Sequence, residues 1–332
     1  MGEVKKKRMR NYLLFLSIVL ISHITYVDNF LVIKQQAKQN NEVAQYVLGL
    51  MYQQGKGVNK DKKLAIDWYN KSAKQQYILA QYALTAIYQY GDGVKRDLEQ
   101  SQYWYKQTAE PRSLILLNKQ KKAMQAIIQT LSQLALKDIN AQYVLAMLYA
   151  SEKKDTEANY WFLVAAMHGD KDAQYYIGLV YNEMIGLFNK TQAIYWLEKA
   201  AQQNNIDAQV ILANIYEQGP ELAPKLTRAA YWYEQAAKLG DIKSQSFIAN
   251  MYRDGKGVTM DKGKAFEWYL KAAKQGDAFS QYNLGNMYAT GDGVTKNLSQ
   301  ATYWYQKAAT QGHTASKLRL KALQTANVQG HK

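Results

Sequence analysis

The tryptophans recur at almost constant spacing, and no other feature of the sequence constrains the fold as strongly. They are Trp68, Trp104, Trp161, Trp196, Trp232, Trp268 and Trp304. The intervals between them are 36, 57, 35, 36, 36 and 36 residues. A period near 36 residues is typical of solenoids in which each repeat is a pair of helices. The spacing therefore predicts seven repeats, with one irregular stretch between the second and the third.

Alignment on the tryptophans shows three further positions that all repeats share. The repeats begin at Ala44, Ala80, Ala141, Ala173, Ala208, Ser244 and Ser280. The second residue of every repeat is glutamine and the ninth is tyrosine, while the sixth is glycine, alanine or threonine. A small sixth residue lets a neighbouring helix approach closely. Apolar residues at positions five, eight and nine have the i, i+3, i+4 spacing of one helix face.

A glycine-rich turn separates the two helices that each repeat predicts. Four repeats carry Gly-x-Gly-Val, at 55–58, 91–94, 255–258 and 291–294. Glycine takes the positive φ that ends a helix and redirects the chain. Asp61, Asp97 and Asp261 follow where the second helix needs an N-cap acceptor. These patterns predict an all-α fold, a right-handed αα-hairpin solenoid.

The last repeat resembles a known family closely. Residues 280–294 read SQYNLGNMYATGDGV and residues 301–309 read ATYWYQKAA, a pattern similar to the Sel-1-like repeat family, whose repeats are tetratricopeptide-like αα-hairpins. The resemblance covers residues 44–315. The third repeat has a truncated turn, and the fourth and fifth lack Gly-x-Gly, so the resemblance leaves their loop geometry open.

Six segments follow from these patterns. Residues 1–30 form an N-terminal signal-anchor or signal peptide, and residues 31–43 a leading half-repeat. Repeats 1 and 2 span 44–109, and repeats 3 to 7 span 141–315. Between them, residues 110–140 are an irregular helical insertion or a degenerate repeat. Residues 316–332 form a terminal helix and tail that cap the last repeat, because the open end of a solenoid needs a cover.

The N-terminus has the charge and hydropathy of an export signal. Five basic residues lie in the first ten, residues 11–27 carry no formal charge, and Asp28 closes the run. Small residues suited to a cleavage site are missing near its end, which favours an uncleaved signal-anchor over a removed peptide. The basic head stays in the cytoplasm. We therefore expect a single-pass protein of the bacterial inner membrane with a periplasmic body; cleavage would give a periplasmic or secreted protein instead.

Composition argues against several classes of function. The net charge is +15, but +4 of it lies in the first ten residues and no basic run follows, so we expect no nucleic-acid binding. With no cysteine, four scattered histidines and no hydrolase motif, the sequence predicts no metal site, no cofactor and no catalytic residue. His168 and His313 have no second ligand nearby in the sequence. Asp92 and Asp292 lie in the glycine turns without a multi-carboxylate calcium loop.

Surface recognition is the function that remains. In the tetratricopeptide-like register, positions three, seven and ten of each repeat face the concave side. Position seven is apolar in repeats 1 to 4 (Leu50, Ala86, Met147, Leu179) and asparagine in repeats 5 to 7 (Asn214, Asn250, Asn286). We expect these asparagines to hold the backbone of an extended ligand by paired donor and acceptor contacts. Arg253 and Tyr282 flank them, and the apolar half extends the contact. The alternative is that the asparagines are simply solvated.

The expected function is a non-catalytic scaffold or adaptor in the bacterial envelope that binds a protein or peptide on the concave face. The resemblance to the Sel-1-like family also implies a second possibility, an immunity protein that neutralises a secreted lipase-type effector. A third, of a different class, is an envelope hydrolase of the β-lactamase-like kind reported for cysteine-rich members. The absence of cysteine argues against that subtype.

Overall fold

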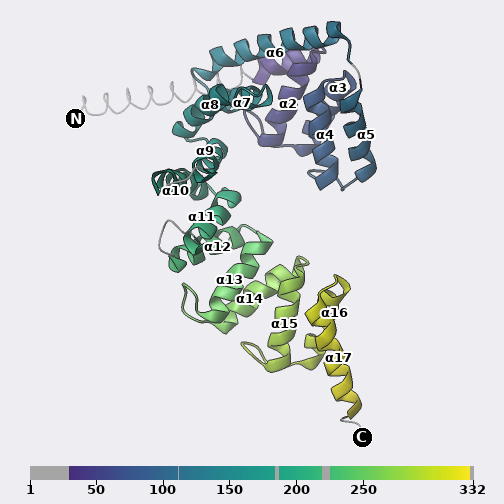
Figure 1. Cartoon of the computed structure of the whole chain (residues 1–332), viewed down its shortest axis with the longest axis vertical. Coiled ribbons are helices and arrows are strands. Elements are labelled where there is room, and N and C mark those ends of the chain that lie inside the picture. The colour runs from purple at the N-terminus through teal and green to yellow at the C-terminus, as the bar shows by residue number, and fades with distance from the viewer. Residues whose placement is uncertain (1–29, 111, 184–186, 219–224, 330–332) are drawn as a thin grey trace, which may run out of the picture. The chain divides into compact units, whose positions relative to one another are not determined.

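The computed structural model describes residues 30–110, 112–183, 187–218 and 225–329, apart from the side chains of 114, 187, 188 and 324–329. Within these ranges every regular element is a helix, which confirms the predicted all-α class (Figure 1). The chain divides into two compact units, Met1–Ala173 and Gln174–Lys332, and each is described separately below. The predicted anchor, residues 11–27, lies outside the described residues.

The helices pair as the repeats predict. Repeat 1 is α2 (Glu42–Gln54) and α3 (Lys62–Lys74), repeat 2 is α4 (Ile78–Tyr90) and α5 (Leu98–Ala109), repeat 3 is α7 (Ile139–Ser151) and α8 (Asp155–Met167), and repeat 4 is α9 (Lys171–Glu183) and α10 (Leu187–Gln202). Repeat 5 is α11 (Ile206–Gln218) and α12 (Leu226–Lys238), repeat 6 is α13 (Ile242–Asp254) and α14 (Lys262–Lys274), and repeat 7 is α15 (Ala278–Thr290) and α16 (Leu298–Thr310). A helix at residues 30–38 precedes repeat 1, and α17 (Thr314–Gln329) follows repeat 7.

The glycine turns and aspartate caps have the predicted geometry. The first glycine of each Gly-x-Gly ends its helix in the left-handed region, as at Gly55 (φ 73°) and Gly291 (φ 81°). The side chains of Asp61, Asp97 and Asp261 each accept a hydrogen bond from a backbone N–H in the first turn of the second helix. These contacts satisfy donors that a helix N-terminus otherwise leaves unpaired.

A buried aromatic or aliphatic side chain lies between the two helices of most repeats. The residue after each tryptophan is Tyr69, Tyr233, Tyr269 or Tyr305 in repeats 1, 5, 6 and 7, and each is at most 2% exposed. The small sixth residue makes room for this ring. A Cβ on Gly285 would lie 2.5 Å from two carbons of the Tyr305 ring, so the helices meet where a side chain is absent.

The shared glutamine at position two ties each repeat to its neighbour. Its Nε2 donates to a backbone carbonyl of the preceding helix, as Gln245 does to Ala237 at 3.1 Å. In repeats 1, 6 and 7 its Oε1 also accepts from the glutamine 30 positions later, as from Gln275 at 2.8 Å. Because the amide is buried, each bond replaces one that water would otherwise supply. The sequence showed this position as invariant among the repeats but did not show its role.

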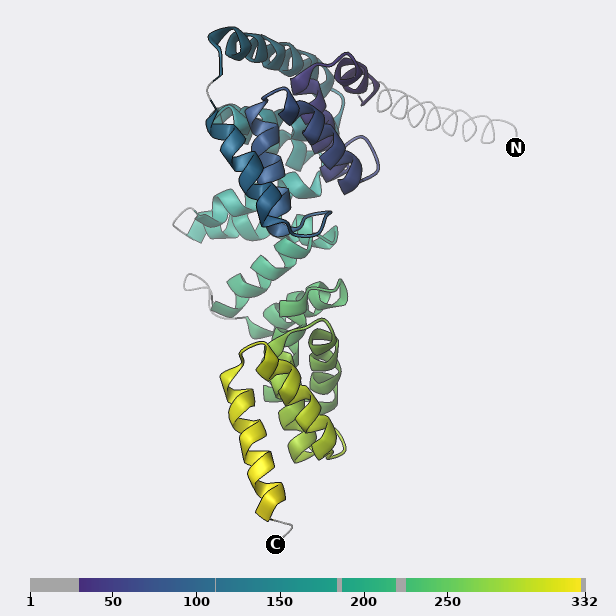
Figure 2. The same cartoon turned by 90° about the vertical axis from the view of Figure 1, so that its right-hand side faces the viewer.

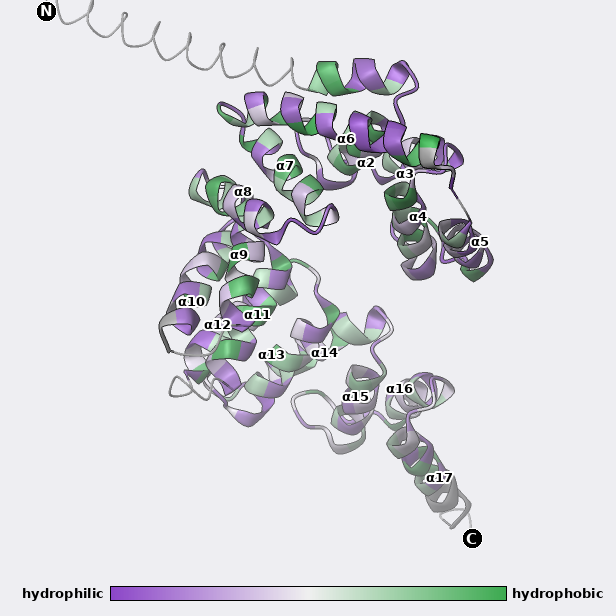
Figure 3. Cartoon of the chain, turned by 45° about the horizontal axis from the view of Figure 1, so that its top comes forward, coloured by the Kyte–Doolittle hydropathy of each residue, from purple (hydrophilic) through white to green (hydrophobic). Residues whose placement is uncertain are grey.

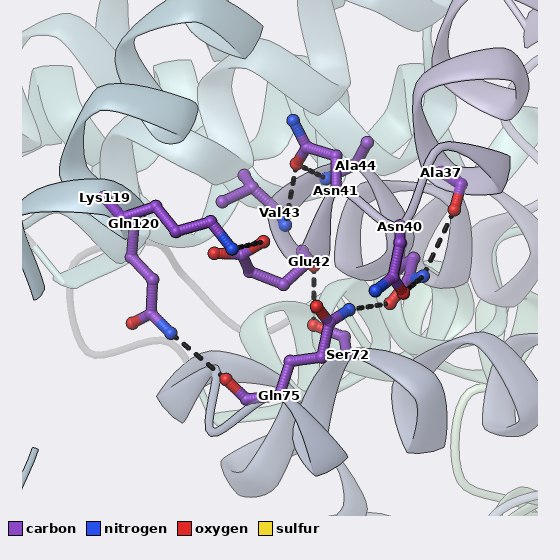
Figure 4. A network of polar contacts seen from close by, with 11 residues as sticks. Ala37, Asn40, Asn41, Glu42, Val43, Ala44, Ser72, Gln75, Lys119 and Gln120 are labelled. Atoms are coloured by element: carbon purple, nitrogen blue, oxygen red, sulfur yellow. Dashed lines mark hydrogen bonds and ion pairs between the residues drawn. The ribbon is translucent and has the colours of Figure 1, made fainter. Parts of the chain in front are cut away.

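The interval 110–140 contains one long helix, α6 (Leu114–Ala135), which does not continue the stack from repeat 2. Instead α6 packs against α2 and α7. Figure 4 shows its polar attachment to repeat 1, in which Lys119 Nζ lies 3.3 Å from Glu42 Oε2 and Gln120 Nε2 donates to the backbone oxygen of Gln75. Repeat 1 therefore has repeat 2 on one side and α6 with α7 on the other.

A largely buried ion cluster joins the turn of repeat 1 to the start of α9 within the first unit. Lys56, in the turn of repeat 1, lies 2.6 Å from Asp170 Oδ2 and 2.8 Å from Asp172 Oδ2. Its Nζ also lies 4.2 Å from the centre of the Tyr143 ring. The Lys56 and Asp170 side chains are 8% and 5% exposed. The cluster links the turn of repeat 1 to Asp170, which lies 114 positions later in the chain.

Within the second unit each repeat packs on the next one in sequence, as an uninterrupted solenoid would. The second helix of each repeat contacts the first helix of the following one, and α16 packs against α17 in the same way. Figure 2 shows α17 lying beside repeat 7 at the C-terminal end. The helix α17 thus covers the repeat that has no successor.

Candidate binding surface

The three predicted asparagines lie at equivalent places on α11, α13 and α15. Each lies against the tyrosine of its own second helix. Tyr269 Oη donates to Asn250 Oδ1 at 2.5 Å and Tyr305 Oη to Asn286 Oδ1 at 2.7 Å. Tyr233 Oη lies 2.7 Å from Asn214 Oδ1 and 2.8 Å from Glu217 Oε2, and its single proton can serve only one of these acceptors. Asn214 is exposed, while Asn250 and Asn286 are half-buried. The tyrosines of repeats 6 and 7 therefore fix the orientation of Asn250 and Asn286.

The tyrosine contacts use only part of the hydrogen-bonding capacity of the asparagines. A carboxamide oxygen has two lone pairs, so an Oδ1 that accepts from a tyrosine can accept once more from a ligand. The Nδ2 groups of Asn214 and Asn250 have no hydrogen-bond acceptor among the described residues. Paired donor and acceptor contacts to a ligand backbone therefore stay a prediction for these amides.

The four residues of the predicted apolar extension differ in exposure. Leu50 is 7% exposed and belongs to the core of the first unit, so it is not available to a ligand. Ala86 is exposed, and Met147 and Leu179 are half-buried. The asparagine half of the candidate surface belongs to the second unit.

Arg253 lies at the centre of this surface. Its Nη1 donates to Tyr269 Oη at 3.0 Å and to Asn283 Oδ1 at 3.2 Å, and its Nε lies 2.7 Å from Asp254 Oδ1. The hydrogen bond from Arg253 lowers the pKa of the Asp254 carboxyl. The guanidinium is half-buried, so these contacts hold its plane in one orientation while leaving part of it accessible.

Two depressions of about 320 Å³ each lie on either side of Arg253, which lines both of them. The first is bordered by Tyr233, Phe247, Asn250 and Phe279, with Glu217, Asp254 and Lys256 around it. The second is bordered by Tyr269, Asn283, Asn286 and Tyr305, with Arg319 of α17 and Asp292 around it. Phe247 and Phe279 are each 43% exposed. Each depression therefore combines aromatic walls with polar groups.

The two depressions differ in charge. The first has two carboxylates, Glu217 and Asp254, and two cations, Arg253 and Lys256, so its charges balance. In the second, Asp292 is paired with Lys262 at 2.6 Å, and Arg319 adds a positive charge beside Arg253. Because Asp292 is paired with Lys262, its negative charge is already partly neutralised within the protein. A ligand that crosses Arg253 therefore meets balanced charges on one side and an excess of positive charge on the other.

Tyr282 lines neither of these two depressions and lies beside Tyr305 and His313. The ring centres are 6.0 Å and 4.8 Å away. Hydrogen bonds from Asn286 and Arg319 lower the pKa of the Tyr282 phenol. Sequence analysis missed Asn283, Tyr269, Tyr305 and Arg319 as members of this surface. The repeated tyrosine after Trp232, Trp268 and Trp304 was the available indication, because it occurs in each repeat that carries asparagine at position seven.

Metal binding and membrane insertion find no structural support in the described residues. They contain no group of three or more histidine, aspartate and glutamate side chains that could hold a metal ion. Asp92, considered above as a cation ligand, is ion-paired with Lys62. No helix among the described residues has both the length and the apolar character needed to cross a membrane.

Comparison with known proteins gives the family. The Sel1 repeat profile matches residues 43–77, 78–110, 139–170, 171–205, 206–241, 242–277 and 278–313. These matches leave α6 outside the repeats. No curated protein matches the sequence.

Two solved structures are similar over most of the chain. A Sel1 repeat protein from Oxalobacter formigenes is 30% identical, with 89% of this chain and 79% of that chain covered and a TM-score of 0.47. A protective antigen of uropathogenic Escherichia coli with this repeat fold, c5321, is 28% identical, with 90% and 70% covered and a TM-score of 0.45. Seven profile matches over most of the length show that the chain belongs to the Sel1 repeat family, whose members are generally scaffolds for protein interaction.

Proposed function

We propose that the second unit is a non-catalytic binding module that holds an extended segment of a partner protein across Arg253. The observation that carries this proposal is the pair of depressions that share this one guanidinium. Arg253 is held by Tyr269 and Asn283, so it is pre-oriented before a ligand arrives. Pre-orientation lowers the entropic cost of binding.

An extended polypeptide carries the kinds of group that this surface can bind. Its backbone carbonyls are acceptors, and the available amide hydrogens of Asn214 and Asn250 are donors. Successive side chains of an extended chain point to opposite sides, so one side chain can enter a depression while the backbone passes Arg253. The aromatic walls at Phe247 and Tyr305 suit an apolar or aliphatic stem in the ligand.

The charges around the two depressions indicate how such a ligand would lie. We expect an acidic side chain beside Arg253 and Arg319, and a polar or uncharged one at the first depression, where the charges of Glu217, Asp254, Arg253 and Lys256 balance. A basic side chain beside Arg319 would meet a like charge. A peptide with one acidic residue is therefore the expected ligand, and the same peptide with lysine at that position is the natural comparison.

The test is selection of peptides from a displayed random library on the full-length protein, followed by titration of the selected peptides. Arg253→Ala is expected to weaken binding at least tenfold, and Asn250→Ala to weaken it by a smaller factor. Tyr269→Phe removes the internal bonds to Asn250 and Arg253 but keeps both of those side chains, so it measures how much their pre-orientation contributes to binding. Tyr303→Ala, at a 49% exposed aromatic on the outer helix α16, is the matched surface control. Peptides that bind Arg253→Ala and wild type equally would refute the proposal.

The N-terminal sequence supports an envelope location for this module. The basic head and the uncharged run at 11–27 favour a signal-anchor that leaves the repeats in the periplasm. Alkaline phosphatase fused after residue 332 is active only when it is exported, so an active fusion is expected in a bacterial host. Activity that disappears when Leu13 to Leu16 are replaced by charged residues would tie export to this run. An inactive wild-type fusion would contradict the location.

A further inference from the structure

The first helix of repeat 2 begins without the cap that its six counterparts have. In the other repeats an asparagine or aspartate precedes the first helix, and its side chain accepts a hydrogen bond from a backbone N–H of the first turn. These caps are Asn41, Asp138, Asp170, Asn205, Asp241 and Asp277. The residue before α4 is Tyr77, whose side chain makes no such bond, and the first turn of α4 has no acidic residue. The positive end of this helix dipole is therefore not compensated by the helix's own side chains.

A depression of about 290 Å³ lies at this end of α4. Its walls come from three parts of the first unit: the start of α4 with Tyr77, one face of α6, and the end of α7. From α6 come Leu117, Lys121 and Met124, which have the i, i+4, i+7 spacing of one helix face. Hydrophobic and hydrophilic residues are mixed along α6 (Figure 3), and the face that lines the depression combines both kinds.

The end of α7 brings negative charge to the same depression. The helix α7 ends at Ser151, and its last turn has no basic residue. The residue that follows, Glu152, adds a carboxylate at the negative end of the helix dipole and lines the depression. Neither Lys121 nor Glu152 forms an ion pair with a described residue. The depression therefore has two sources of positive potential, the start of α4 and Lys121, and two of negative potential, the end of α7 and Glu152.

The Tyr77 hydroxyl is a second indication that the depression takes a ligand. The Tyr77 side chain is 4% exposed, and its hydroxyl has no hydrogen-bond partner among the described residues. Buried polar atoms are nearly always hydrogen-bonded, so an orphaned hydroxyl in the wall of a depression indicates a missing partner. Burial raises the pKa of this phenol, and Tyr46 and Glu152 raise it further. The hydroxyl therefore keeps its proton and is available as a donor.

We propose that this depression is a binding site for a free α-amino acid with an apolar side chain. The carboxylate of such a ligand suits the uncapped start of α4 and Lys121, because both attract an anion. Its ammonium group suits Glu152 and the end of α7, which attract a cation. Leu117 and Met124 provide apolar contacts for the ligand's side chain.

The charges and the size of the depression favour a small zwitterion over other ligands. A ligand with only a negative charge would be repelled by Glu152, and one with only a positive charge would be repelled by Lys121. Pockets that take drug-sized molecules have volumes of roughly 300–1,000 Å³. A depression of about 290 Å³ suits a smaller ligand. An amino acid carries both charges and an apolar group within one molecule of this kind.

Calorimetric titration of the full-length protein in mild detergent compares L-leucine with two analogues. L-Leucinamide lacks the carboxylate, and N-acetyl-L-leucine lacks the ammonium group. Each analogue is expected to bind about tenfold more weakly than leucine, because each loses one charge-assisted contact. N-acetyl-L-leucine that binds as tightly as leucine would indicate a site for the C-terminus of a peptide, and leucinamide that does so a site for an N-terminus. Either result, or no binding of leucine, would overturn the proposal.

Two variants that remove a charge locate the contacts. Lys121→Met is expected to weaken leucine binding about fivefold and to reduce the preference for leucine over leucinamide. Glu152→Gln should likewise reduce the preference for leucine over N-acetyl-L-leucine. Because Lys121 and Glu152 are exposed, circular dichroism should be unchanged in both variants.

Two controls separate this site from the rest of the surface. Lys122→Met removes the neighbouring exposed lysine of α6, which does not line the depression, and should leave leucine binding unchanged. Arg253→Ala, in the second unit, should also leave it unchanged, so this site and the peptide-binding surface proposed above can fail independently. Equal effects of Lys121→Met and Lys122→Met, or unchanged preferences in both charge-removing variants, would exclude the site.

Discussion

Gln275 donates a hydrogen bond of 2.8 Å to Gln245, 30 residues earlier in the chain. The same bond joins Gln75 to Gln45 and Gln311 to Gln281. The corresponding residue of repeat 5 is leucine, Leu239, and Gln209 Oε1 is buried there without a hydrogen-bond partner. The backbone is nearly the same at both places, with φ −82° and ψ 1° at Leu239 and φ −86° and ψ 3° at Gln275.

Leu239→Gln is therefore expected to stabilise the protein. The new amide would supply the missing donor to Gln209, and a hydrogen bond of this kind contributes about 1 kcal/mol. Gln275→Leu is the reverse change in repeat 6 and should lower the free energy of unfolding by about 1–2 kcal/mol. Urea denaturation followed by circular dichroism measures both. If Leu239→Gln proves neutral while Gln275→Leu destabilises, the orphan acceptor of Gln209 carries no cost.

Lys56→Met should be strongly destabilising. It would leave Asp170 and Asp172 close together in a buried site without their cation, and breaking such a pair costs about 3–5 kcal/mol. Lys62→Met is the control, because its ion pair with Asp92 is exposed and is expected to contribute less than about 1 kcal/mol. Adding Asp170→Asn and Asp172→Asn to Lys56→Met should recover part of the loss. Equal effects of the two lysine substitutions would contradict the buried cluster.

Gly285→Ala tests the close approach between α15 and α16. The added Cβ would meet two Tyr305 ring carbons at 2.5 Å, and overpacking of this kind costs about 1–3 kcal/mol. Gly263→Ala is a matched change at an exposed glycine of α14, where the nearest atom outside the helix backbone is 3.4 Å away. It should stabilise by up to about 1 kcal/mol through helix propensity. Thermal unfolding compares the two, and the same sign for both would disprove the packing argument.

Buried tyrosines should make the first unit sensitive to alkali. Desolvation by burial raises the pKa of Tyr46 from 10.0 to about 12. The unfolded chain loses this proton near pH 10 while the folded chain retains it, so the contribution of Tyr46 to stability is complete below pH 10 and is lost as the pH rises toward 12. Where the folded state binds one proton more than the unfolded state, the free energy of unfolding falls by about 1.4 kcal/mol per pH unit. Tyr46→Phe should reduce the slope of unfolding free energy against pH between 10 and 12 by up to this amount; an unchanged slope would show that other groups dominate.

Most of the fold could be predicted because most contacts in a repeat protein lie within one repeat or between adjacent repeats. The 36-residue period, the glycine turns and the caps at Asp61 and Asp97 depend on contacts within one repeat or between adjacent repeats. Helical periodicity also indicated a helix in 110–140. What periodicity could not give is the partner of that helix, because amphipathic spacing shows that a face is apolar but not what it packs against. The attachment of α6 to repeat 1 through Lys119 follows only from the structure.

Sequence reasoning identified some of the residues around the candidate surface and not others. Asn250 and Arg253 were identified from their places in the repeat, and the structure puts both at the border of one depression. The bond from Tyr269 to Asn250 joins helices whose residues are 19 apart in sequence, and no local pattern determines that register. Arg319 enters the surface from α17, which lies beyond the last repeat and so outside any comparison among repeats.

The packing of α6 against α2 and α7 also affects how the chain folds. Contacts in an ordinary helical array span about one repeat, which lets such proteins fold quickly from any starting point. The pairing of Lys56 with Asp170 spans 114 residues, so it cannot form until α6, repeat 3 and the loop before α9 are all in place. We expect repeats 1 and 2 to associate early. The side of repeat 1 that contacts α6 and α7 would then stay uncovered until Lys56 pairs with Asp170. During synthesis, the interval between those two steps is when the first unit is most exposed to misassembly.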